Sequence, residues 1–154
     1  MSTSPFDPSK YKWREVEGDP TLSYKVRHDY TVLGYDADAG TLDMLVRWTG
    51  DGGHCPLHRH TATTTVLVLD GEQHLTDINP DGSKGDKKVR QAGEYALSVG
   101  NDLPHLEHGG SEGGVAFFGC HTSTGSLYEL LDEDMNVVMD VTIEGLVEDW
   151  EANA

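Results

Sequence analysis

The feature that most constrains the fold is a succession of short runs with alternating apolar and polar residues, separated by Gly, Asp, Asn or Pro. In residues 41–48, the apolar side chains at every second position point to one face, while Asp43 and Arg47 point to the other. Residues 63–69 are β-branched and almost all apolar, as in a strand covered on both sides. Short strands of this kind, interrupted by turn formers, predict an all-β barrel or sandwich.

The turn formers suggest how these strands connect. Asp70-Gly71 predicts a tight turn that joins 63–69 to 72–78 in a hairpin. The polar run 79–88 predicts a surface loop, and the glycines of 109–114 predict a turn. Further strands are predicted at 94–99, 115–120, 127–131 and 137–142, with a turn over 132–136. Residues 143–150 predict a short helix with Leu146, Val147 and Trp150 on one face.

The length and charge of the chain narrow its organisation and its partners. At 154 residues we expect one domain: an N-terminal segment over 1–28, the barrel over 29–142 and a C-terminal segment over 143–154. The net charge of -16 argues against binding to nucleic acid or to anionic membranes. No leader-like or membrane-spanning run is evident, so we expect a cytoplasmic protein. Two cysteines are too few for a disulfide framework.

Histidines provide the strongest chemical signal. His58 and His60 are two residues apart, and side chains at positions i and i+2 of a strand project from the same face. His105, which follows Pro104, is the candidate third ligand from another strand. Neutral imidazole binds Fe, Zn, Cu or Ni, and three protein ligands leave coordination positions open, as in a catalytic metal site.

The glycines around these histidines carry a family resemblance. The series Gly52, His58, His60 and Gly71 resembles the first cupin motif, and Gly93 to Gly109, with Pro104-His105, resembles the second. The resemblance implies an RmlC-like jelly-roll cupin β-barrel with a short C-terminal helix. It also implies a homodimer or homotetramer.

Thr64 stands where most cupins have a glutamate ligand. A site with three histidines and no such glutamate resembles the small acetylacetone (β-diketone) dioxygenases and the dihydroxyacetophenone dioxygenases. This likeness implies a non-haem Fe(II) dioxygenase that uses O₂ to cleave a C–C bond in a small carbonyl substrate, either a β-diketone or an aryl ketone.

Several alternatives remain open at the level of sequence. His108 competes with His105 as the third ligand, although strand alternation places His105 and Glu107 on one face and His108 on the other. Glu107 is either a catalytic base or a carboxylate at the barrel rim. The metal could instead be Zn or Ni in an isomerase, lyase or hydrolase. The segment from His58 to His60 is also similar to zinc-binding cupin sensors related to anti-sigma factors.

Overall fold

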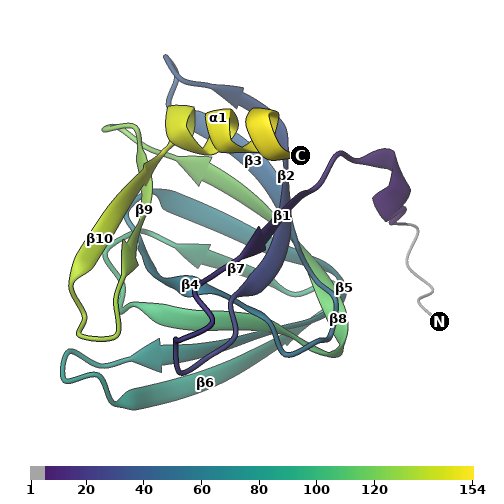
Figure 1. Cartoon of the computed structure of the whole chain (residues 1–154). Coiled ribbons are helices and arrows are strands. Elements are labelled where there is room, and N and C mark those ends of the chain that lie inside the picture. Colours follow the sequence, from purple (N-terminus) through teal and green to yellow (C-terminus); the bar gives the residue numbers. More distant parts are fainter. Residues whose placement is uncertain (1–5) are drawn as a thin grey trace.

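The computed structural model describes residues 6–154, which form one strongly curled antiparallel sheet with a helix at its end (Figure 1). The all-β prediction is confirmed. A short 3-10 helix at Pro8–Lys10 precedes the sheet. The strands are β1 Arg14–Glu17, β2 Arg27–Asp36, β3 Thr41–Trp48, β4 His54–His60, β5 Thr63–Ile78, β6 Lys84–Gln91, β7 Tyr95–Ser98, β8 His105–His121, β9 Ser126–Leu131 and β10 Val137–Thr142, followed by helix α1 Ile143–Asn153.

Two long strands organise the sheet. β5 and β8 pair along almost their whole length, from Thr63 opposite His121 to Asp77 opposite His105. One path of the sheet runs in the order β1-β2-β3-β8-β4-β9-β10, and β5 connects β8 to β6 and β7. Because β8 pairs with β3, β4 and β5, its N-terminal and C-terminal parts contribute to different walls of the curled sheet.

The predicted hairpin at Asp70-Gly71 is wrong. β5 continues through these residues, and its pairing with β8 shifts register on either side of Gly71. Gly71 has a φ of +63°, and a Cβ there would lie 2.4 Å from the carbonyl oxygen of Gly113. The glycine therefore allows a bulge that bends the strand, where the sequence suggested a reversal of the chain.

The turn predicted at 109–114 and the loop predicted at 79–88 also need correction. Residues 109–114 lie inside β8, where the register against β5 shifts between Gly109 and Gly114. Lys84 already belongs to β6, which pairs with β5, so the loop ends before it. In the segment predicted to precede the barrel, β1 pairs with β2 and extends the sheet. In each case, pairing with another strand decides the local structure.

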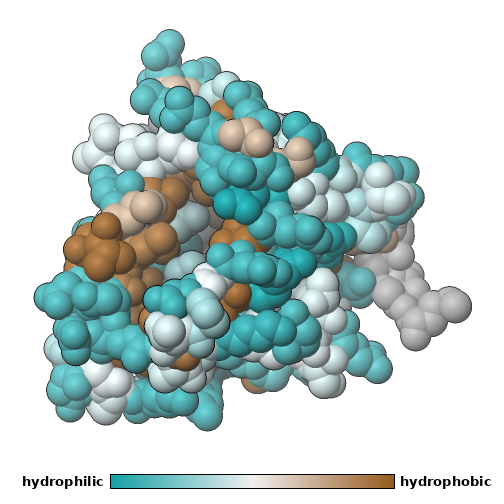
Figure 2. All heavy atoms as spheres, in the orientation of Figure 1, coloured by the Kyte–Doolittle hydropathy of each residue, from teal (hydrophilic) through white to brown (hydrophobic). Residues whose placement is uncertain are grey.

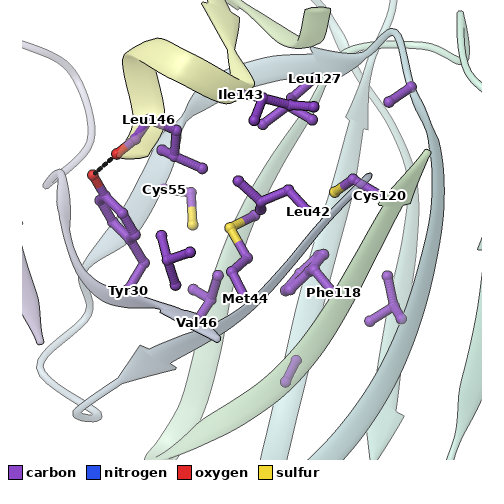
Figure 3. Close-up of a cluster of buried hydrophobic side chains, with 14 of the residues drawn as sticks. Tyr30, Leu42, Met44, Val46, Cys55, Phe118, Cys120, Leu127, Ile143 and Leu146 are labelled. Atoms are coloured by element: carbon purple, nitrogen blue, oxygen red, sulfur yellow. Dashed lines mark hydrogen bonds between the residues drawn. The ribbon is translucent and has the colours of Figure 1, made fainter. Parts of the chain in front are cut away.

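The apolar core lies inside the curled sheet, beneath α1 (Figure 3). Leu42 and Phe118 approach it from β3 and β8, while Ile143 and Leu146 close it from the helix. The side chain of Thr142 accepts a hydrogen bond from the backbone nitrogen of Gly145 and caps the helix. α1 therefore covers one end of the barrel, and the predicted C-terminal helix is confirmed.

Candidate metal centre

Three histidines converge on the inner side of the curled sheet. His58 and His60 lie on β4, and His105 begins β8 directly opposite His58 in the strand register. One ligand nitrogen from each of the three rings lies within 4.8 Å of the other two. The ring centroids are 4.4 to 5.3 Å apart. Paired strands thus bring together the three side chains that the sequence nominated.

Neighbouring hydrogen bonds set the tautomers of two of these rings. Nδ1 of His58 lies 2.7 Å from the carbonyl oxygen of Pro56, which can only accept, so this nitrogen carries the proton. The hydroxyl of Thr64 donates to the carbonyl oxygen of Ala62 at 3.1 Å and so accepts from Nδ1 of His60 at 3.4 Å. Both contacts occupy Nδ1 and leave Nε2 as the nitrogen available to a ligand. Such partners are the usual means of orienting a metal-binding imidazole.

Nε2 of His105 provides an independent test of the fit to a metal. This atom is buried and has no hydrogen-bond partner within the described residues. An unsatisfied buried nitrogen costs free energy unless something binds it. A divalent cation shared with His58 and His60 would satisfy it, so the residues present fit a metal ion.

The protonation state of the histidines also suits a cation. Burial, followed by the charge of His58, lowers the pKa of His60 to about 4. Burial likewise holds the pKa of His105 well below its usual value. Both imidazoles are therefore neutral at neutral pH, which is the form that binds metals.

Glu107 lies beside the histidines and is only 2% exposed, so its placement at the barrel rim is wrong. Its Oε1 is 3.4 Å from Nε2 of His58 and 3.9 Å from Nε2 of His105. Gln73 donates a hydrogen bond to the other carboxylate oxygen. Burial acts to raise the pKa of Glu107, but the interaction with His58 and the hydrogen bond from Gln73 lower it to about 2. The site therefore holds a negative charge. This charge comes from the carboxylate of Glu107 on β8, whereas Thr64, at the usual glutamate position, is neutral.

His108 lies apart from this cluster. Its ring packs between those of His54 on β4 and His74 on β5, with centroid distances of 4.6 and 4.9 Å. Its Nδ1 lies 2.6 Å from the carbonyl oxygen of Gly109. The strand alternation of β8 thus separates His108 from His105, as the sequence indicated.

Two cavities meet at the histidine cluster, and His60, Glu107 and Phe118 line both. The larger, of 470 Å³, includes His58 and is mainly apolar; its further lining residues include Tyr30, Met44, Val46, Tyr128, Leu130, Met139, Val141 and Leu146. Apolar surface gathers over the β9–β10 hairpin beside a hollow in the molecule (Figure 2). Val138 and Met139 of β10 are exposed there. The smaller cavity, of 340 Å³, includes His105 and is more polar; its lining includes Gln73, Asp77, Lys88, Arg90, Ser98 and Asp102.

Gln73, Arg90 and Tyr128 were not singled out from the sequence. Alternation along 72–78 puts Gln73, Leu75 and Asp77 on one face. This shared face was the only sequence signal that Gln73 could line the cavity. That signal does not show which face is interior, because both faces of this strand contain polar residues.

Comparisons with solved structures identify the fold. No family model matches the sequence, and no curated protein matches it. Among solved structures, an RmlC-like cupin protein from Ralstonia eutropha superposes with a TM-score of 0.67 at 16% identity, covering 99% of this chain and 87% of that chain. An acetylacetone dioxygenase from Acinetobacter johnsonii superposes with a TM-score of 0.65 at 9% identity, covering 100% and 93%. The DMSP lyase DddQ from Ruegeria pomeroyi gives 0.56 at 14% identity, covering 79% and 61%.

These likenesses show that the chain has the RmlC-like cupin fold, as the two glycine and histidine motifs indicated. The neighbours differ in activity, since a dioxygenase and a lyase are both among them, so the fold does not define the reaction. Within residues 6–154, no helix has both the length and the hydropathy that a bilayer span requires.

Proposed function

We propose that this protein is a metal-dependent cupin oxidoreductase, a non-haem Fe(II) dioxygenase that cleaves a C–C bond in a small β-diketone or aryl ketone. The observation that carries the proposal is the convergence of three histidine rings beside a mainly apolar cavity. His58, His60 and His105 would hold the metal and leave positions open. A bound Fe(II) would supply Lewis acidity toward a chelating enolate and the capacity to activate O₂.

The protein residues supply orientation and proton transfer. Pro56 and Thr64 fix the rings of His58 and His60 through their Nδ1 atoms. Oε1 of Glu107 would accept the proton that the substrate loses on becoming an enolate, while Gln73 holds Oε2. With its low pKa, Glu107 is ionised at neutral pH and is only a weak base. It can serve as the acceptor because chelation makes the substrate more acidic.

The size and the apolar lining of the 470 Å³ cavity suit a small organic substrate. A cavity of this size suits a molecule with one aromatic ring or a short alkyl chain. Phe118 and Tyr128 offer aromatic surfaces within reach of the histidines; the ring centroids of His60 and Phe118 are 6.5 Å apart, and those of His58 and Tyr128 are 5.5 Å apart. Apolar walls would also exclude water from the reacting carbonyl group.

The test is oxygen uptake by protein purified without oxygen and loaded with Fe(II). Acetylacetone, benzoylacetone and 2,4'-dihydroxyacetophenone form the substrate panel. Cleavage of a β-diketone by one O₂ gives a carboxylic acid and a 1,2-dicarbonyl compound, so one O₂ should disappear for each substrate molecule. Turnover without O₂, or with Zn or Ni alone, would instead support an isomerase, lyase or hydrolase. Tight zinc binding with no turnover of any substrate would support a sensor.

A further inference from the structure

The second cavity differs from the apolar one in its charge. The 340 Å³ cavity reaches His60, His105 and Glu107 and is lined on the β6 side by two cations, Lys88 and Arg90. The chain has only 11 lysines and arginines against 27 acidic residues. Two cations in the lining of a cavity that reaches the candidate metal centre therefore call for a chemical explanation.

Strand pairing explains why these two cations line the cavity. Arg90 is opposite Gln73 and Lys88 is opposite Leu75 in the antiparallel register of β6 and β5. All four residues line the cavity. The intervening Val89 and the preceding Lys87 are exposed and do not line it. Of the two cations that line the cavity, Arg90 is half-buried and Lys88 is exposed, so Arg90 supplies the positive charge on its inner side.

Arg90 is the cation with direct access to the site, and most of its hydrogen-bonding capacity is unused. Its Nη1 donates to Oε1 of Gln73 at 3.0 Å, and Gln73 in turn donates to Glu107. Within residues 6–154, neither Arg90 nor Lys88 has a carboxylate oxygen within ion-pair distance. A guanidinium has five N–H donors in a planar fork that matches a carboxylate. The half-buried Arg90 therefore offers an unfilled anion site.

The acidic residues of the same cavity do not fill this site. Asp102 accepts a hydrogen bond from the hydroxyl of Ser98 at 2.7 Å, on the β7 side. Asp77 is opposite His105 in the register, four residues along β5 from Gln73. Neither carboxylate pairs with Arg90, so an anion at Arg90 must come from a bound molecule.

We propose that the substrate of this site is a β-diketone that carries a carboxylate, a 2,4-dioxo acid, with its carboxylate on Arg90 and its apolar substituent in the 470 Å³ cavity. This inference rests on the proposed function and names its substrate class. The two cavities share His60, Glu107 and Phe118, so a molecule bound at the histidines has one compartment for each end. Lys88 adds positive charge further along β6.

Binding to the zinc-loaded protein, measured by isothermal titration calorimetry without O₂, tests the inference separately from turnover. The probes are benzoylpyruvate and its methyl ester, which share the diketone and the phenyl ring and differ in the carboxylate charge. Arg90→Gln keeps an amide that can still donate to Gln73 but removes the charge. We expect this variant to bind benzoylpyruvate at least about tenfold more weakly and the ester within about twofold of the parent protein.

Lys87→Gln is the matched control, because it removes the same charge from an exposed residue of β6 that does not line the cavity. It should bind both probes as the parent protein does. Zinc content and melting temperature should match in all three proteins, which excludes loss of the fold or of the metal. Equal weakening of acid and ester in Arg90→Gln, or no weakening of either, would overturn the carboxylate site. If the acid-specific loss is found but Fe(II)-loaded protein consumes no O₂, the dioxygenase proposal fails and the anion site stands.

Discussion

Oγ1 of Thr64 lies 3.4 Å from Nδ1 of His60, and its own proton is directed to the carbonyl oxygen of Ala62. Thr64 is fully buried on β5, while His60 ends β4, so the contact joins two strands at the candidate metal centre. Thr64, which stands where the cupin resemblance places a glutamate ligand, would thus act on a bound metal only through His60. The hydroxyl selects the tautomer in which Nε2 of His60 is free to bind.

Replacing Thr64 with valine should weaken metal binding without removing it. Valine keeps the shape of threonine but cannot accept the proton of His60 Nδ1, and loss of such an orienting partner costs about 10- to 100-fold in metal affinity. Competition titration against a chelator measures the change. Thr64→Ser restores the acceptor and is the control. Equal affinity in the valine variant and the parent protein would show that the contact does not orient His60.

Two alanine variants distinguish between His105 and His108 as the third metal ligand. His105→Ala should abolish stoichiometric metal because two histidines remain, whereas His108→Ala should retain one metal per chain because its ring packs against His54 and His74. Elemental analysis of protein dialysed against dilute metal measures both. Metal loss in His108→Ala with the fold retained would reverse the assignment of the third ligand.

The strand pattern and the common face of His58 and His60 could be predicted because both depend on local periodicity, whereas the choice of His105 as their partner drew on the resemblance to the second cupin motif. Alternation gave β3 with its observed bounds, and it placed His105 and Glu107 on the face opposite His108. The path of β5 could not be predicted in this way. Asp70-Gly71 is a common turn pair, and only continued pairing with β8 on both sides of Gly71 makes it a bulge.

The polar neighbours of the site were missed for a related reason. Gln73 and Arg90 lie on strands whose two faces are both polar, so periodicity cannot tell which face meets the cavity. Their pairing across β5 and β6 settles the question. The assembly as a homodimer or homotetramer, the cytoplasmic location and the division into segments stay predictions.

The contact of α1 with the N-terminal strands should depend on pH. Asp149 of α1 binds Arg14 and Tyr30, while Arg14 lies on β1 and Tyr30 on β2. Burial acts to raise the pKa of Asp149, but hydrogen bonds from Arg14 and Tyr30 lower it below the usual 3.8. The ionised form therefore favours the folded state. This contribution is present above pH 3.8 and is lost as the pH falls through the lowered pKa.

Asp149→Asn should accordingly destabilise the protein at neutral pH and make less difference in acid. The free energy of unfolding in urea, compared between parent and variant at pH 7 and near pH 3, measures the change. Glu148→Gln, one residue away on an exposed part of α1, is the charge-matched control. A difference between parent and Asp149→Asn that stays constant over this pH range would show that the carboxylate charge contributes nothing.

Glu107→Gln tests the role of the buried carboxylate. The replacement keeps the size of the side chain, and the amide oxygen can still accept the hydrogen bond from Gln73. An amide cannot take up the substrate proton, so we expect one bound metal per chain and oxygen uptake reduced by about 100-fold or more. Elemental analysis and oxygen uptake on the same preparation separate the two roles. If the variant loses its metal while retaining its fold, the carboxylate acts as a ligand and the proton acceptor must be sought elsewhere.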